Sequence, residues 1–131
     1  MQHGIAKVIE MAVEAVGPSA DCPLHLSLDI DSVDPHFAPG TGTAARGGLS
    51  YREIHYICEE CALTKRLVSM DLVEVNPGLD PPPDMPSVEG QLEGGGGAPV
   101  LHGDNPAIKP SSPTVRLAIE LILSALGKQI C

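Results

Sequence analysis

The chain has 131 residues, a net charge of −9 and an aromatic content of only 2%, with no Trp. A length of about 100–150 residues is common for one domain, so we expect a single domain or a piece of one. The negative charge argues against nucleic acids and anionic membranes as partners, because both bind clusters of Lys and Arg. A metal ion or a cationic small molecule is the expected partner.

The sequence also carries information on the compartment. No apolar run reaches the roughly 20 residues that span a bilayer, and the first residues, MQHGIAKVIE, lack the apolar core of a signal peptide. These features predict a protein of the cytoplasm. A peroxisome-like organelle is the alternative, although the chain ends in Lys-Gln-Ile-Cys rather than in the Ser-Lys-Leu address.

The four cysteines fit a reducing compartment. Cys58 and Cys61 form a C-x-x-C inside a predicted helix. A structural zinc site would need a second such pair or two histidines at ligand spacing, and the sequence has neither. We expect buried thiols on a helix face.

The first predicted element is an amphipathic helix over residues 4–16, which the residues Gly17 and Pro18 end. Its apolar side chains recur at spacings of three and four and share one face: Ile5, Val8, Ile9, Ala12, Ala15 and Val16. Residues 24–28 form a short apolar run between Pro and Asp, which is typical of a buried strand. Residues 31–49 are irregular and rich in Gly and Pro.

Ser50 begins the next predicted helix. With Glu53 it forms a capping box, in which the Ser side chain accepts a hydrogen bond from a free helical N–H and the Glu side chain returns to the backbone of the cap residue. This helix should run to about residue 63. Residues 67–73, LVSMDLV, are again short and mostly apolar, as in a buried parallel strand.

The segment 76–111 has no periodicity and contains PPP and GGGG, a composition that predicts a flexible loop. Ser112 and Pro113 then supply an N-cap and a first-turn proline, and a strongly apolar helix should continue to Gly127. Alternating helices and strands predict an α/β fold. Two parallel strands leave much backbone unpaired, so we expect the chain to be part of a larger sheet.

Asp29 and Asp31 are the candidate metal ligands. They lie two residues apart at the carboxyl end of a predicted strand, so they should project from the same face into the crevice where α/β proteins hold ligands. Oxygen ligands without thiolate favour Mg²⁺, Ca²⁺ or Mn²⁺. Asp34 is nearby but precedes Pro35, and we expect it to cap the turn instead of binding the metal. For the Asp29 and Asp31 pair, a solvated acidic turn is the alternative. An EF-hand is excluded, because Asp34 and Gly40 stand where its loop needs Gly and Glu.

The string SLDIDSVDPHFAPGTGTAARGGLSYRE, followed by SMDLVEVNP, resembles the C-terminal signature of the ureohydrolases, which hydrolyse guanidino compounds to urea and an amine. The match runs over about residues 4–79 and resumes in the last helix. The pairing of GGLSYRE with EVNP looks like arginase, because agmatinase-like members tend to carry Ser or Ala in place of Asn76. The resemblance implies the C-terminal part of one ureohydrolase domain, a three-layer αβα fold with a mostly parallel sheet. A flexible insertion at about 77–111 departs from the family pattern.

The same resemblance implies a site with two Mn²⁺ ions, in which Asp29 and Asp31 are metal ligands. It places Glu74 opposite the substrate guanidinium, and Thr43 where a hydroxyl approaches the substrate. A metal ion can lower the pKa of bound water from 15.7 to about 7, which makes hydroxide available to attack the guanidinium carbon. Arginine would be split into ornithine and urea.

Other parts of the family's site do not occur in this sequence. The family takes further ligands from a histidine and from an Asp-x-His-x-Asp string, and a further histidine assists proton transfer. No such string is present, and we assign no catalytic role to the five histidines: His3, His25, His36, His55 and His102. We therefore expect no catalytic residue in this chain and little activity from it alone.

Two alternatives stay open for the function, namely an agmatinase-like or other guanidino or amidino hydrolase, and a truncated, non-catalytic metal-binding module. The resemblance further implies a homotrimer, whose subunit contact would involve Arg52, Glu53 and Glu59. Ion pairing on the helix surface is the simpler explanation for these three charges.

Overall fold

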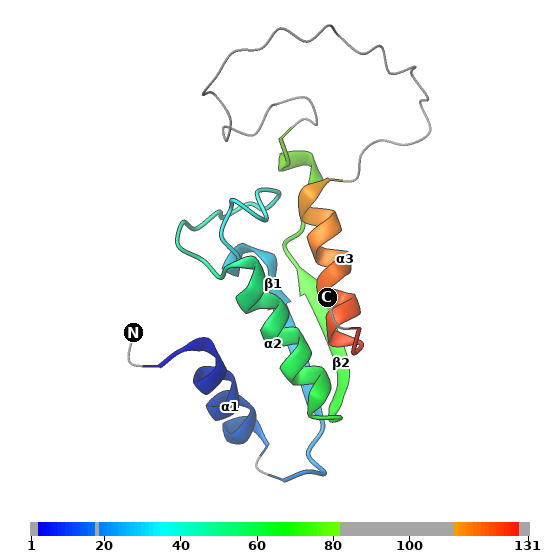
Figure 1. The fold of residues 1–131 in the computed structure, drawn as a ribbon. Helices are drawn as coiled ribbons and strands as arrows, with labels where there is room; N and C mark the ends of the chain where they lie inside the picture. The colour runs from blue at the N-terminus through cyan, green and yellow to red at the C-terminus, as the bar shows by residue number, and fades with distance from the viewer. Residues whose placement is uncertain (1–2, 18, 82–111, 129–131) are drawn as a thin grey trace, which may run out of the picture.

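The computed structural model describes residues 3–17, 19–81 and 112–128. These ranges contain the helices α1 (Ile5–Val16), α2 (Tyr51–Leu63) and α3 (Pro113–Ala125), the strands β1 (Leu24–Asp29) and β2 (Leu67–Val73), and the short 3-10 turns η1 (Ile30–Ser32) and η2 (Pro77–Leu79). Figure 1 shows α2 and α3 side by side against the two strands, with α1 next to α2.

The two strands form a parallel pair. Leu26 lies opposite Met70, and the last paired residues are Asp29 and Val73. Parallel neighbours need a crossover, and α2 is the helix between the two strands. The predicted α/β pattern with parallel strands is therefore present in the described part of the chain.

One face of this sheet is apolar and packs under α2 and α3. Leu26, Leu28, Met70 and Leu72 lie on it. The buried core that they join combines strand, loop and helix residues: Leu28, Ile30, Val33, Ala38, Ile54, Cys58, Leu117, Leu121 and Ala125. Burial of this apolar surface is the main force that holds the two helices on the sheet.

The opposite face of the sheet is polar and exposed. His25 Nδ1 lies 2.8 Å from Ser69 Oγ, and His25 Nε2 lies 3.3 Å from a carboxylate oxygen of Asp71. Parallel sheets are ordinarily covered on both faces. The described residues thus form one helical layer and an incomplete sheet of the predicted three-layer arrangement.

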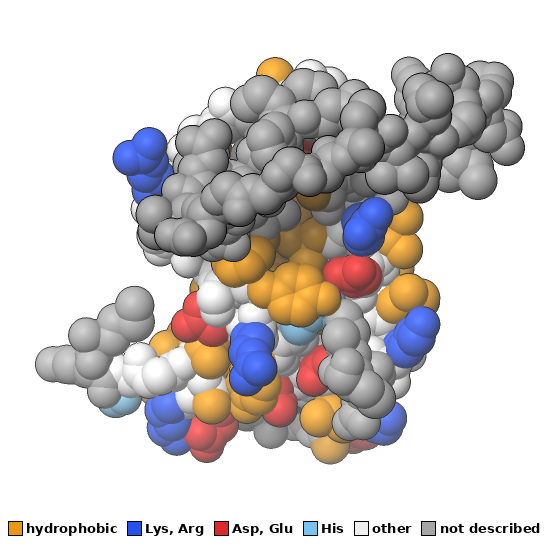
Figure 2. Space-filling view, turned by 45° about the horizontal axis from the view of Figure 1, so that its top comes forward, with side chains coloured by type: hydrophobic (Ala, Val, Ile, Leu, Met, Phe, Trp, Pro, Cys, Tyr) orange, Lys and Arg blue, Asp and Glu red, His pale blue; other side chains and the backbone are white. Residues whose placement is uncertain are grey.

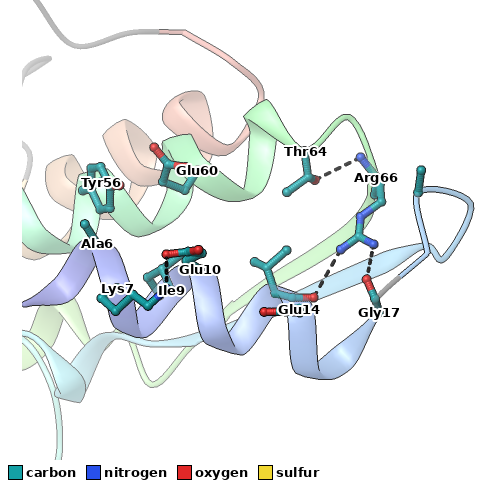
Figure 3. Close-up of a pocket in the computed structure, with 12 residues that line it drawn as sticks. Ala6, Lys7, Ile9, Glu10, Glu14, Gly17, Tyr56, Glu60, Thr64 and Arg66 are labelled. Atoms are coloured by element: carbon teal, nitrogen blue, oxygen red, sulfur yellow. Dashed lines mark hydrogen bonds and ion pairs between the residues drawn. The ribbon is translucent and has the colours of Figure 1, made fainter. Parts of the chain in front are cut away.

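The helix α1 has no buried residue. Arg66, which precedes β2, connects the end of α1 to the sheet. Its guanidinium donates hydrogen bonds to the carbonyl oxygens of Val13 (3.4 Å) and Ser19 (2.6 Å). It also donates one to the carbonyl oxygen of Gly17, which Figure 3 shows. Large apolar side chains such as Met11 and Val68 remain exposed. Figure 2 shows hydrophobic side chains open to solvent between charged ones.

The local signals in the sequence predict most element ends. The capping box of Ser50 and Glu53 is confirmed, as is the Ser112 N-cap of α3. The helix α3 ends slightly earlier than expected, at Ala125. No helix within the described ranges is both long enough and apolar enough to cross a membrane.

The segment for which the composition predicts a flexible loop begins with a hydrogen-bonded turn, at residues 76–80. Asn76 caps η2, since its side chain accepts a hydrogen bond from the N–H of Gly78 at 3.1 Å. Asp80 then binds the first turn of α3. Polar side chains that find partners far along the chain order this segment, which composition does not reveal. The remainder of the predicted flexible insertion, residues 82–111, lies outside the described residues.

Candidate functional site

Asp29 and Asp31 lie close together, but for a different reason from the predicted one. The strand ends at Asp29, and Asp31 belongs to the 3-10 turn η1, so strand alternation does not align them. Instead, the turn folds back and the backbone N–H of Asp31 donates a hydrogen bond to Oδ1 of Asp29 at 3.2 Å. Both residues are partly exposed.

The two carboxyl groups affect each other. Partial burial, the charge of Asp29 and a hydrogen bond to the Asp29 side chain all raise the pKa of Asp31. Two neighbouring carboxylates repel each other, and a proton or a cation between them relieves the repulsion. The pair is therefore suited to hold a cation.

The donor atoms fit a hard divalent ion such as Mn²⁺, because both are carboxylate oxygens. They do not fill a coordination sphere. Within the three described ranges, no group of three or more His, Cys, Asp and Glu side chains comes together in a way that could hold a metal. Asp29 and Asp31 could therefore supply only part of the ligands that a metal site needs.

Asp34 has a separate structural role. Its Oδ1 accepts a hydrogen bond from the backbone N–H of His36 and its Oδ2 accepts one from Gly47, each at 2.9 Å. These two bonds lower the pKa of Asp34. The expectation that Asp34 caps the turn is confirmed.

Glu74 follows β2 directly. Since Val73 is paired with Asp29, the strand ends bring Asp29 and Glu74 to the same edge of the sheet. Glu74 is exposed and has a φ of 64°, an uncommon backbone conformation for a residue other than glycine. Non-glycine residues in this conformation are enriched at functional sites.

Thr43 lies in the exposed loop that leads from the β1 turn to α2. Its side chain has no hydrogen-bond partner among the described residues. The neighbouring Thr41 is instead buried, at 5% exposure, and its hydroxyl also finds no partner in the described part of the chain. Two glycines shape the loop: Gly47 has a φ of 81°, and a Cβ on Gly48 would lie 2.7 Å from backbone atoms of Ser32 and Asp34.

A polar network at the start of α3 was not predicted. Asp80 accepts hydrogen bonds from the hydroxyls of Ser112 and Thr114, and the Thr114 hydroxyl accepts one from the backbone N–H of Gly40. The partners are 32–74 residues apart in the sequence. Spacing in the sequence gives no signal for this network, although it does predict Ser112 as a helix cap.

The histidines that the structure describes lie apart from the two aspartates. His55 is buried between α2 and α3, where Nδ1 lies 3.0 Å from Ser124 Oγ and burial lowers its pKa. His3, His25 and His36 are exposed, and His102 lies outside the described residues.

Cys58 and Cys61 are buried, as the sequence predicts. Burial raises the pKa of the Cys58 thiol to about 12. Of the three residues expected at a subunit contact, Arg52 is exposed and Glu53 is the capping-box carboxylate of α2, bonded to Ser50. Glu59 is partly exposed.

A family model and a sequence relative of this chain point to the same family. A family model described as the Arginase family matches residues 1–89. The arginase of Plasmodium falciparum (isolate 3D7) is 46% identical over 130 residues, which cover 98% of this chain and 28% of that protein.

Solved structures of arginases are also similar to this chain. The chain is similar in fold to the crystal structure of arginase from Bacillus subtilis subsp. subtilis str. 168, with a TM-score of 0.70 and 33% identity over 99% of this chain and 34% of that chain. Arginase from Entamoeba histolytica in complex with L-ornithine gives a TM-score of 0.66 and 27% identity over 97% of this chain and 32% of that one. The likeness confirms the predicted α/β class, and the chain spans only about a third of the length of these relatives.

Proposed function

Because the chain belongs to the arginase family, we propose that it is the carboxyl-terminal part of a Mn²⁺-dependent arginase, which hydrolyses L-arginine to L-ornithine and urea. One observation supports this most directly: Asp29 and Val73 are paired at the ends of neighbouring parallel strands, and Glu74 follows Val73. Open α/β sheets bind ligands in the crevice outside these strand ends.

Asp29 and Asp31 would hold one side of a site for two Mn²⁺ ions. When bound, the ions supply Lewis-acid activation of water near neutral pH. The hydrogen bond from the Asp31 N–H fixes Oδ1 of Asp29 and so limits the positions that its other carboxylate oxygen can take. The remaining ligands would come from residues outside this chain, since the chain covers 28% of the P. falciparum arginase and contains no Asp-x-His-x-Asp string.

Glu74 and Thr43 are the proposed substrate contacts. A carboxylate can accept two parallel N–H bonds from a planar guanidinium, which fixes both the position and the orientation of that group. The exposed carboxylate of Glu74 at the strand end suits this role. Thr43 would add a hydroxyl from the neighbouring loop. None of the chain's histidines is assigned the delivery of a proton to the leaving amine.

A guanidino or amidino hydrolase with another substrate, such as agmatine, is the second candidate within this chemistry. Glu74 would face the guanidinium of either compound, so the choice depends on residues that contact the rest of the substrate. The test is urea release by the full-length protein with Mn²⁺, measured on arginine and on agmatine. Greater kcat/KM on arginine supports the proposal, and greater kcat/KM on agmatine replaces it with the second candidate.

A non-catalytic metal-binding module is the candidate from a different class, and the incomplete ligand set in the described residues favours it. Calorimetric titration of Mn²⁺ into the chain alone distinguishes such a module from a part of an arginase. We expect weak binding from two carboxylates. Tight binding to a stably folded chain, together with no urea release by the full-length protein, would favour the module.

We also propose that the complete protein is a cytoplasmic homotrimer, with Arg52, Glu53 and Glu59 near the subunit contact. Arg52 is exposed at the start of α2, where it is accessible to a second subunit. Analytical ultracentrifugation of the full-length protein tests the trimer, with Arg52→Ala expected to weaken it and Lys7→Ala as the surface control. Cell fractionation tests the compartment.

A further inference from the structure

Three segments meet at the first turn of α3: the loop after β1, the turn after β2 and the start of the helix itself. We call their shared hydrogen-bond network the Asp80 clamp, made of Gly40, Asn76, Asp80, Ser112 and Thr114. Thr114 is its centre and is fully buried. Its hydroxyl donates a hydrogen bond to Oδ1 of Asp80 at 2.6 Å and accepts one from the backbone N–H of Gly40 at 2.8 Å.

The peptide groups of Gly40 are held on both sides. The N–H of Gly40 donates a hydrogen bond to the Thr114 hydroxyl. The carbonyl oxygen of Gly40 accepts one from the backbone N–H of Asn76 at 2.8 Å. Gly40 precedes Thr43 by three residues, and Asn76 follows Glu74 by two. The clamp therefore joins the loop that carries Thr43 to the strand end that carries Glu74.

The contact at Gly40 is too close for any side chain. A Cβ there would lie 2.6 Å from Oδ1 of Asp80 and 2.9 Å from Oγ1 of Thr114. The carboxylate of Asp80 thus packs directly on the loop backbone. Its position at the start of the 13-residue helix α3 is also favourable, because the N-terminal end of a helix attracts negative charge.

We propose that Asp80 and Thr114 are positioning residues for the guanidino substrate: through Gly40 and Asn76 they fix the distance between the Thr43 loop and Glu74. This inference rests on the proposed function, in which Thr43 and Glu74 contact the substrate. Neither Asp80 nor Thr114 touches the substrate itself. A hydroxyl at position 114 is required because it must donate and accept at the same time, which Ser can do and Val cannot.

The test uses Thr114→Val, Thr114→Ser and Asp80→Asn in the full-length protein, with steady-state urea release from arginine as the first readout. Loss of the buried hydroxyl leaves the Gly40 N–H without a partner, so the loop shifts and substrate binding weakens. We expect KM to rise about five- to tenfold in Thr114→Val and Asp80→Asn with little change in kcat. Thr114→Ser should restore the original KM.

If Thr114 and Asp80 only stabilised the fold, the variants would show a different pattern. A smaller fraction of the enzyme would be folded and active, so the apparent kcat would fall while KM stayed the same. Ser124→Ala is the matched control: it removes another buried hydroxyl of α3, one that contacts His55 rather than the clamp. Its KM should stay unchanged. A wild-type KM in folded Thr114→Val, or a KM in Ser124→Ala that rises as much, would overturn the inference.

Amide hydrogen exchange separates this inference from the proposed function, because it needs no activity. In Thr114→Val, exchange should become about tenfold faster or more at the Asn76 N–H, one step beyond the lost bond. If the wild-type protein releases no urea, the proposed function fails while this exchange result still supports the link across Gly40. Unchanged exchange at Asn76 would overturn the link whatever the activity, and Asp80→Asn provides the same readout if Thr114→Val does not fold.

Discussion

The backbone N–H of Asp31 donates a hydrogen bond to Oδ1 of Asp29 at 3.2 Å, so the turn that ends β1 also brings two carboxyl groups together. Their mutual repulsion favours a cation between them. The paired strand ends bring Glu74 to the same edge of the sheet.

Replacing Asp31 with Asn should weaken Mn²⁺ binding to the full-length protein by more than about tenfold. Loss of a group that only supports a metal ligand already costs about 10–100-fold in affinity, and Asp31 is a proposed ligand. Titration calorimetry measures the affinity. Asp21→Asn is the control, since it removes an exposed carboxylate in the turn before β1. Equal weakening by both substitutions would mean that only net charge matters.

Replacement by alanine should destabilise the protein at Gly48 but not at Gly42, although both glycines lie in the same loop. A Cβ at Gly48 would lie 2.7 Å from the Asp34 N and Ser32 O backbone atoms, so Gly48→Ala should lower the free energy of unfolding by about 1–3 kcal/mol. Gly42 has open space around it, and Gly42→Ala should change stability by no more than about 0.5 kcal/mol. Denaturant unfolding followed by circular dichroism compares them. A similar loss in both variants would contradict the close packing at Gly48.

Stability should fall as the pH decreases below about 6.5, in part because of His55. Burial lowers the pKa of His55, while the nearby carboxylates of Glu120 and Glu59 oppose this shift. Between the lowered pKa and 6.5 the unfolded chain binds more protons than the folded one, so stability is lost as pH falls through that window. Denaturant midpoints from pH 7.5 to 5 should show a smaller loss in His55→Gln than in wild type. His36→Gln, at an exposed position, should keep the wild-type loss.

The thiols of α2 should be unreactive in the folded protein. Burial raises the pKa of Cys58 to about 12, and the thiol is not exposed to solvent. Because the thiolate is the reactive form, iodoacetamide should label Cys58 only after denaturation. Peptide mapping by mass spectrometry distinguishes it from the partly exposed Cys22. Labelling of native Cys58 as fast as Cys22 would show that α2 opens readily.

The sequence predicts the elements of this fold well because their signals are local. The Ser50 and Glu53 capping box, the Ser112 N-cap and the apolar run of β2 each depend on residues a few positions apart. Two features are not predicted correctly. Strand alternation does not align Asp29 with Asp31, because the strand ends at Asp29 and the backbone turns there to form η1. A D-x-D pattern is compatible with both conformations.

The Asp80 clamp could not be predicted for a different reason. Its partners, Gly40, Asp80 and Thr114, come from three separate segments, and only the packed structure brings them together. The surrounding Gly- and Pro-rich composition is typical of loops without order, which concealed the role of Asp80. The roles of Asp29, Asp31, Glu74 and Thr43 remain predictions from the family pattern.

The most direct test of the central claim is urea release from arginine by the full-length protein with saturating Mn²⁺, compared between wild type, Asp31→Ala and Asp21→Ala. We expect Asp31→Ala to reduce kcat/KM by at least about a hundredfold, because the proposed metal site loses a ligand, while Asp21→Ala should stay near wild type. Wild-type urea release by Asp31→Ala would contradict the claim.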